Sequence, residues 1–104
     1  MNLKYINEIL PGRWMHSHEE DNEGSLVFRP ASFHFPRSRG RSGFELKRDH
    51  ALIEIKLGSG DCPVEQNGQW ELDELGCLKL EHDNEIDTLQ IVSAEKDRLV
   101  VKRR

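Results

Sequence analysis

Long hydrophobic runs are absent from this sequence, and cysteine is scarce. No segment approaches the roughly 20 apolar residues that cross a bilayer, and the first residues contain no apolar stretch that marks a secretory signal. The two cysteines, Cys62 and Cys77, match no zinc-binding spacing. We therefore expect a cytoplasmic protein with two free thiols and no membrane partner.

An excess of basic residues is absent too. The chain has 15 Lys and Arg against 19 Asp and Glu, and nucleic-acid binding needs a basic face that neutralises phosphates. It also contains no glycine loop for phosphates, no nucleophile elbow and no metalloprotease helix. The sequence therefore predicts no nucleic-acid partner, and we assign no catalytic residue, no metal ligand and no cofactor.

What the sequence does contain is a series of short segments in which apolar and polar residues alternate. The 104 residues are expected to form one domain, residues 1–104, with a modest core. Period-two alternation predicts β-strands, and the segments 49–50, 73–76 and 95–97 predict tight hairpins. The expected strands lie at residues 13–20, 25–29, 43–48, 51–57, 69–74, 77–82, 87–94 and 97–103.

A short helix or helical turn is expected within residues 1–10, closing one end of the domain. Leu3, Ile6 and Leu10 recur at helical spacing, and Pro11 follows directly. Farther along, residues 12–14 (Gly-Arg-Trp) and 68–70 (Gly-Gln-Trp) each bring a large indole to the start of a strand. Eight short strands with tight connections predict an all-β fold, an eight-stranded antiparallel up-and-down barrel that leaves no free edge.

The Gly-x-Trp motif at residues 12–14, after a short helix and at the start of a first strand, resembles the lipocalin and wider calycin pattern. Residues 10–20 (LPGRWMHSHEE), 29–30 (RP) and 39–45 (RGRSGFE) resemble a group of small bacterial lipocalin-like proteins of unknown function. This resemblance extends over most of the chain. It implies the barrel fold and carries over no ligand.

The first expected strand has a polar inner face. If Trp14 points into the barrel, His16, His18 and Glu20 do so too, because side chains alternate across a strand. A bulge or a one-residue slip would exchange them for their odd-numbered neighbours. The residues expected to face inward on the other strands are all apolar: Leu26, Phe28, Phe44, Leu46, Ile53, Ile55, Leu57, Trp70, Leu72, Leu78, Leu80, Leu89, Ile91, Leu99 and Val101.

The polar stripe on the first strand is one candidate site. Two imidazoles and a carboxylate can hydrogen-bond a polar ligand, transfer a proton or bind a divalent metal. A metal would also need His34 or His82. The alternative is a set of half-exposed polar residues at a barrel mouth, with no binding role.

The long connection over residues 29–41 is the other candidate site, because it combines aromatic residues with clustered arginines. Phe33 and Phe35 can fold over the barrel mouth as a lid, and Arg37, Arg39 and Arg41 can then bind a carboxylate or phosphate. In the alternative interpretation, the arginines pair with the acidic run at residues 19–23 on the surface.

The leading hypothesis is noncatalytic binding of a small, partly apolar or anionic ligand in or at the mouth of the barrel. The alternatives are a protein-interaction module with a side-chain-filled barrel and an enzyme that uses His16 and His18. The expected ligand-binding residues are His16, His18, Glu20, Phe33, Phe35, Arg39 and Arg41.

Overall fold

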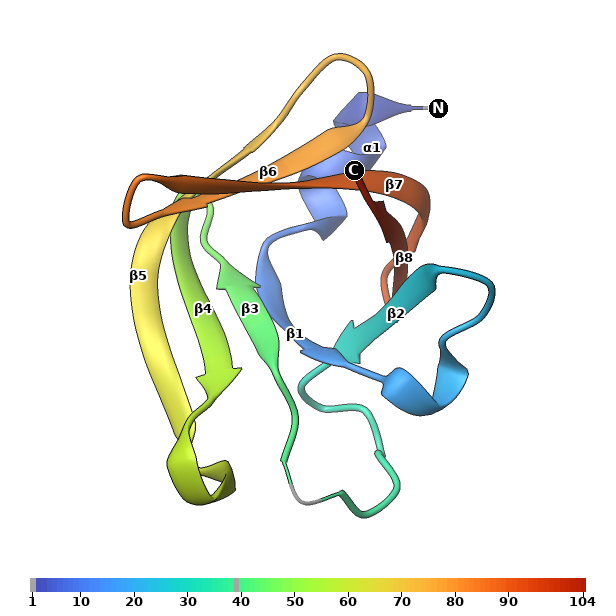
Figure 1. The fold of residues 1–104 in the computed structure, drawn as a ribbon. Coiled ribbons are helices and arrows are strands. Elements are labelled where there is room, and N and C mark those ends of the chain that lie inside the picture. The colour runs from blue at the N-terminus through green and yellow to red at the C-terminus, as the bar shows by residue number, and fades with distance from the viewer. Residues whose placement is uncertain (1, 39) are drawn as a thin grey trace.

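Eight antiparallel strands close into a barrel in the computed structural model, which describes residues 2–38 and 40–104 (Figure 1). The up-and-down barrel expected from the alternating segments is therefore confirmed, together with its short N-terminal helix. The elements are α1 (Leu3–Ile9), β1 (Gly12–His16), η1 (a 3₁₀ turn, His18–Glu20), β2 (Ser25–Pro30), β3 (Gly43–Leu46), β4 (Ala51–Leu57), η2 (a 3₁₀ turn, Ser59–Asp61), β5 (Pro63–Leu72), β6 (Cys77–His82), β7 (Glu85–Glu95) and β8 (Arg98–Arg103).

The order of strands around the barrel is β1-β2-β8-β7-β6-β5-β4-β3. From β3 to β8 each strand pairs with the next one in the chain, whereas β1 lies between β2 and β3. Trp14 accordingly pairs with Pro30 on one side and with Phe44 on the other. The connection over residues 31–42 must therefore carry the chain from one side of β1 to the other.

Two strand boundaries differ from the expected ones by more than two residues. β1 ends at His16, four residues before the predicted end, because the chain turns into η1 after Ser17, whose N–H makes the last hydrogen bond to β2, at the Val27 carbonyl. β5 begins at Pro63, six residues early, because its first half pairs with β4 along the whole length of that strand. The hairpins expected at 49–50, 73–76 and 95–97 are confirmed.

The helix and both indoles build one end of the core. Ile6 and Leu10 are buried in the same cluster as Trp14 and Trp70. The indole N–H of Trp14 donates to the Leu10 carbonyl at 2.8 Å, and that of Trp70 donates to the Lys47 carbonyl at 2.8 Å. Each tryptophan ring thus packs in the interior, while its indole N–H is hydrogen-bonded to a backbone carbonyl just outside a strand.

Most of the inward residues are as expected. The apolar residues predicted for β2, β3 and β5–β8 belong to the core cluster or pack against it. β4 is the exception: Leu52 pairs with Leu46 and Glu54 pairs with Phe44, so these residues, and not Ile53, Ile55 and Leu57, share the inner face. The prediction for β4 was wrong because both faces of this strand carry apolar residues. Ile55 lies on the outer face and is nevertheless buried, so apolar character does not distinguish the two faces.

Both cysteines are free thiols, as expected, with Cys62 exposed and Cys77 buried. In the described part of the chain, no helix has the length and apolar character needed to cross a membrane.

Candidate functional site

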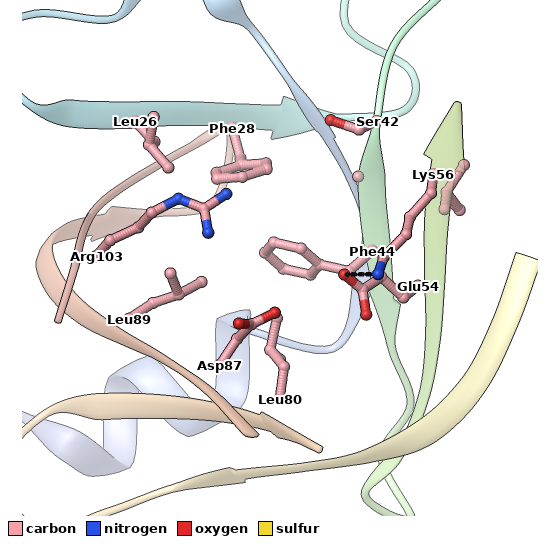
Figure 2. A pocket seen from close by; sticks show the side chains of 12 residues that line it. Leu26, Phe28, Ser42, Phe44, Glu54, Lys56, Leu80, Asp87, Leu89 and Arg103 are labelled. Carbon is pink, nitrogen blue, oxygen red and sulfur yellow. Dashed lines mark ion pairs between the residues drawn. The ribbon is translucent and has the colours of Figure 1, made fainter. Parts of the chain in front are cut away.

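The barrel interior contains a cavity of about 190 Å³, which neither Trp14 nor Trp70 lines (Figure 2). Its walls are apolar on several strands and carry charged groups of both signs. Its lining side chains include Phe28, Phe44, Glu54, Asp87, Leu89 and Arg103.

The strand register explains why charged groups enter the interior here. Glu54 lies across from Phe44, and Asp87 lies across from Leu80. Arg103 lies across from Leu89 at the end of β8. Directly paired residues share a face of the sheet, so each charged residue is carried inward by an apolar partner.

Around this cavity the charges are partly compensated. Lys56 Nζ lies 3.9 Å from Glu54 Oε1, and the Lys56 side chain is about half exposed at the rim. Figure 2 shows the Arg103 guanidinium pointing into the space beside the ring of Phe28. Phe28 and Phe44 form an aromatic pair with ring centroids 4.8 Å apart. The cavity can therefore take an apolar body at its wall and a polar group near Arg103.

His82, the last residue of β6, adds an imidazole to this charged end. It is only 3% exposed. Its Nε2 lies 2.6 Å from Glu54 Oε2 and 3.7 Å from Asp87 Oδ2. The three groups can offer ligand atoms that all lie within 4.8 Å of one another. These are the described residues that can hold a metal ion.

His16 is the predicted site residue that does face the interior. It pairs with Phe28, and the two rings lie 5.2 Å apart between centroids. Its Nε2 is 2.9 Å from Asp21 Oδ2, and Asp21 also accepts the N–H of Val27. The imidazole is therefore held at the rim by a carboxylate that stabilises the η1 turn.

The inward positions expected for His18 and Glu20 were wrong, because both lie in η1, beyond the end of β1. His18 is exposed, with its ring 6.1 Å from that of His16 between centroids. Glu20 accepts hydrogen bonds from Nε and Nη2 of Arg29 at 2.9 and 2.7 Å, and from the Ser17 hydroxyl. Arg29 follows the inward Phe28 on β2, so Glu20 is bound at the outer face.

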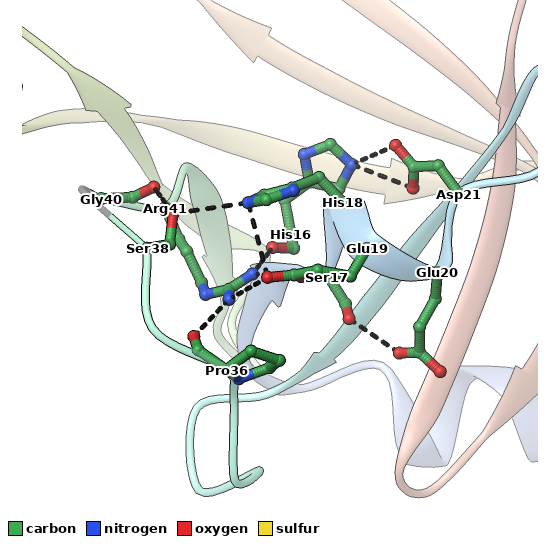
Figure 3. A network of polar contacts seen from close by, with 10 residues as sticks. All are labelled: His16, Ser17, His18, Glu19, Glu20, Asp21, Pro36, Ser38, Gly40 and Arg41. Atoms are coloured by element: carbon green, nitrogen blue, oxygen red, sulfur yellow. Dashed lines mark hydrogen bonds and ion pairs between the residues drawn. The ribbon is translucent and has the colours of Figure 1, made fainter.

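Arg41 also binds the η1 turn. It lies in the connection of residues 31–42 that passes from one side of β1 to the other, here called the crossing segment. Arg41 makes a bidentate pair with Glu19, at 2.8 and 2.6 Å, and donates to the carbonyls of His16 and Pro36 (Figure 3). The alternative in which loop arginines pair with the acidic run therefore describes Arg41. Hydrogen bonds from Arg41 lower the pKa of Glu19 to about 2, and those from Arg29 do the same for Glu20.

Phe33 and Phe35 contact each other, with ring centroids 5.0 Å apart. The Arg29 guanidinium lies 4.6 Å from the Phe33 centroid, and that of Arg41 lies 4.5 Å from the Phe35 centroid. The two rings thus pack on the ion pairs of the crossing segment, and neither lines the cavity. The expected site residue Arg39 lies outside the described residues. Ligand contacts for the expected set stay predictions.

The residues missed by the sequence interpretation are Glu54, His82, Asp87 and Arg103. A signal existed for three of them: His82 continues the inward alternation of Leu78 and Leu80, Asp87 is in phase with Leu89, and Arg103 is in phase with Leu99 and Val101. Glu54 was hidden because the other face of β4 is more apolar. Comparison of the chain with protein-family models, curated proteins and solved structures finds no match.

Proposed function

We propose that this protein binds a small, partly apolar anion noncatalytically in the lumen of its barrel. One observation carries the proposal: the polar end of the lumen contains a cavity whose walls combine apolar side chains with charged groups, and the guanidinium of Arg103, an exposed residue at the end of β8, points into it. The competing hypothesis of a side-chain-filled barrel predicted no such space. Arg103 would pair with the anionic group, and Phe28 and Phe44 would contact the apolar body.

The size of the cavity limits the ligand. Its volume of about 190 Å³ is below the roughly 300–1,000 Å³ of pockets that bind drug-sized molecules. An apolar cavity of about 150 Å³ is enough for benzene. The expected ligand is therefore a compound with one ring or a short chain and a single anionic group.

Two finer statements belong to this proposal. The closed antiparallel barrel and the helix before Trp14 support a relationship to lipocalin-like, calycin-type barrels. The lack of a long apolar segment supports a cytoplasmic location with no membrane partner, and the excess of acidic over basic residues argues against a nucleic-acid partner. Binding in the lumen does not depend on either statement.

Three one-ring probes with different charges test the proposal: benzoate, benzyl alcohol and benzylamine, titrated into the metal-free protein and followed by NMR. We expect benzoate to shift the amide signals of Phe28, Phe44 and Leu89. Loss of the charged pair in Arg103→Gln should weaken benzoate binding by roughly tenfold, about 1.4 kcal/mol, and should affect benzyl alcohol less.

Arg13→Gln is the matched control, because Arg13 pairs with Glu45 and Glu65 and lies one residue from the inward Trp14, on the opposite face of β1. It should leave the binding of all three probes unchanged. Absence of shifts with every probe at millimolar concentration would overturn the proposal. Tighter binding of benzylamine than of benzoate would contradict the anionic ligand.

A further inference from the structure

We propose that Glu54, His82 and Asp87 bind one divalent transition-metal ion, with Zn²⁺ as the probe of choice. The site lies on the wall of the cavity, on strands β4, β6 and β7. The proposal does not require an organic ligand, so it stands or fails separately from the function proposed above.

The spacing of the three groups fits one ion. Zn²⁺ is bound by imidazole nitrogen and carboxylate oxygen at about 2.0–2.2 Å, which places the ligands of a tetrahedral ion roughly 3.4 Å apart. His82 Nε2 lies 2.6 Å from Glu54 Oε2 and 3.7 Å from Asp87 Oδ2. These two distances bracket that separation, so small side-chain rotations suffice to coordinate an ion.

The state of His82 is an independent reason to infer a ligand. Its side chain is almost fully buried, and neither ring nitrogen has a hydrogen-bond partner among the described residues. Glu54 Oε2 is likewise without one. Nε2 and Oε2 are thus in close contact without the alignment of a hydrogen bond. Buried polar atoms of this kind are rare unless water or an ion satisfies them.

The backbone behind His82 keeps the imidazole in this position. Gly68 on β5 lies so close to β6 that a Cβ atom there would be 2.1 Å from the Glu81 carbonyl oxygen and 3.2 Å from His82 Cβ. This close backbone approach fixes the position of the His82 Cβ atom relative to β5. A ligand held rigidly by its strand loses little conformational freedom when it binds an ion.

The type of donor favours a transition metal. One imidazole with two carboxylates suits Zn²⁺ and neighbouring first-row ions, whereas Ca²⁺ and Mg²⁺ prefer sites made of oxygen. Lys56, which lies 3.9 Å from Glu54 Oε1, is the cation that would compete. Its half-exposed side chain can turn to solvent. Because Glu54 and Asp87 line the cavity, the remaining coordination positions would face it.

The test is isothermal titration of the metal-free protein with Zn²⁺ alone. The Cys62→Ser background is used throughout, because this exposed thiol can bind zinc by itself. We expect one ion per chain with micromolar or tighter affinity. Glu54→Gln and Asp87→Asn keep the side-chain shape, and each should weaken binding at least tenfold. His82→Gln should abolish it.

His16→Gln is the matched control, since it removes another imidazole that contacts a carboxylate. It should leave zinc affinity unchanged. Thermal unfolding without metal checks that each variant is folded, and the half-exposed Asp87 keeps one variant informative if the buried ones unfold. Co²⁺ should give visible absorption without a thiolate charge-transfer band.

Two results would overturn the site. One is no zinc binding by the wild-type protein up to millimolar concentration. The other is equal zinc affinity in the wild-type protein, Glu54→Gln and Asp87→Asn. If His16→Gln lost zinc affinity while these two variants kept it, the ion would bind at the rim and not at the proposed site. None of these outcomes affects the benzoate titration, which is done without metal.

Discussion

At the scale of single residues, Gly68 marks a close backbone approach in the barrel wall. This glycine shares the inner face with its cross-strand partner Leu52. The backbone of β6 occupies the place where its side chain would be, with Glu81 O 2.1 Å from an added Cβ atom. Glycine inside a strand commonly marks a bend of a barrel or a close backbone contact.

Gly68→Ala should therefore destabilise the protein by about 1–3 kcal/mol, because backbone and not a flexible side chain must move. Urea unfolding measures the change. Gly58→Ala is the control: its Cβ would meet a methyl group of the exposed Val64 at 2.8 Å, which can turn away. The control should change stability by less than about 1 kcal/mol. Equal midpoints for the two variants would contradict the tight approach at Gly68.

Residue types predicted the core better than the site. Trp14 and Trp70 are large, apolar and in phase with their neighbours, so sequence alone placed both inside. Glu54 could not be found this way, because its strand carries Ile53 and Ile55 on the opposite face. Only the pairing of β4 with β3 decides which face is enclosed, and that pairing is a property of the closed sheet.

At the scale of elements, two arginine–glutamate pairs hold the η1 turn, one to β2 and one to the crossing segment at residues 31–42. Arg29 binds Glu20 and Arg41 binds Glu19, each through two nitrogens. The Arg29 side chain is 16% exposed and that of Glu20 31%, so the pair is partly shielded from solvent and from salt screening. These contacts fix the segment that passes from β2 to β3.

The pairs predict a specific loss of stability in acid. Hydrogen bonds from Arg29 and Ser17 hold the pKa of Glu20 at about 2 in the folded protein, below the ordinary 4.5. The unfolded chain therefore binds the proton more readily, so this stabilisation is present above about pH 4.5 and is lost as the pH falls toward 2. Urea midpoints at pH 7, 5, 3 and 2 should trace that loss.

Arg29→Gln tests the assignment. It should lower stability at pH 7 by about 1–3 kcal/mol, the range for a hydrogen bond to a charged group, and should flatten the decline between pH 5 and 2. Arg13→Gln, which breaks only exposed pairs with Glu45 and Glu65 at 3.5 and 3.7 Å, should change neither. A variant at position 29 with the wild-type acid dependence would rule out the role of this pair.

The elements themselves were largely predictable, whereas their order in space was not. Alternation and turn residues located each strand to within a few residues, except for the ends of β1 and β5. No local sequence pattern predicts that β1 lies between β2 and β3, because this order depends on which distant strands pair. The ion pair of Arg41 with Glu19 forms because residues 31–42 cross from one side of β1 to the other. The sequence therefore leaves this pair as one of two alternatives for the loop arginines.

At the scale of the whole molecule, closure of the barrel leaves each strand paired on both sides. No strand can leave without breaking two ladders, so the sheet is expected to unfold as one unit. The two indoles report on distant parts of this ring. Trp14 is on β1 and Trp70 on β5, with β3 and β4 between them, and both are buried, at 3% and 4% exposure.

Two variants with one tryptophan each, Trp14→Phe and Trp70→Phe, test this cooperativity. Each loses an indole hydrogen bond to a carbonyl and should be less stable than wild type by about 1–3 kcal/mol. Within each variant, however, the fluorescence transition in urea should coincide with the loss of β-sheet signal in far-ultraviolet circular dichroism. If the remaining indole became exposed at lower urea than the sheet signal was lost, that side of the ring would open first. A barrel in which every strand depends on both neighbours would then be the wrong description of what holds this protein together.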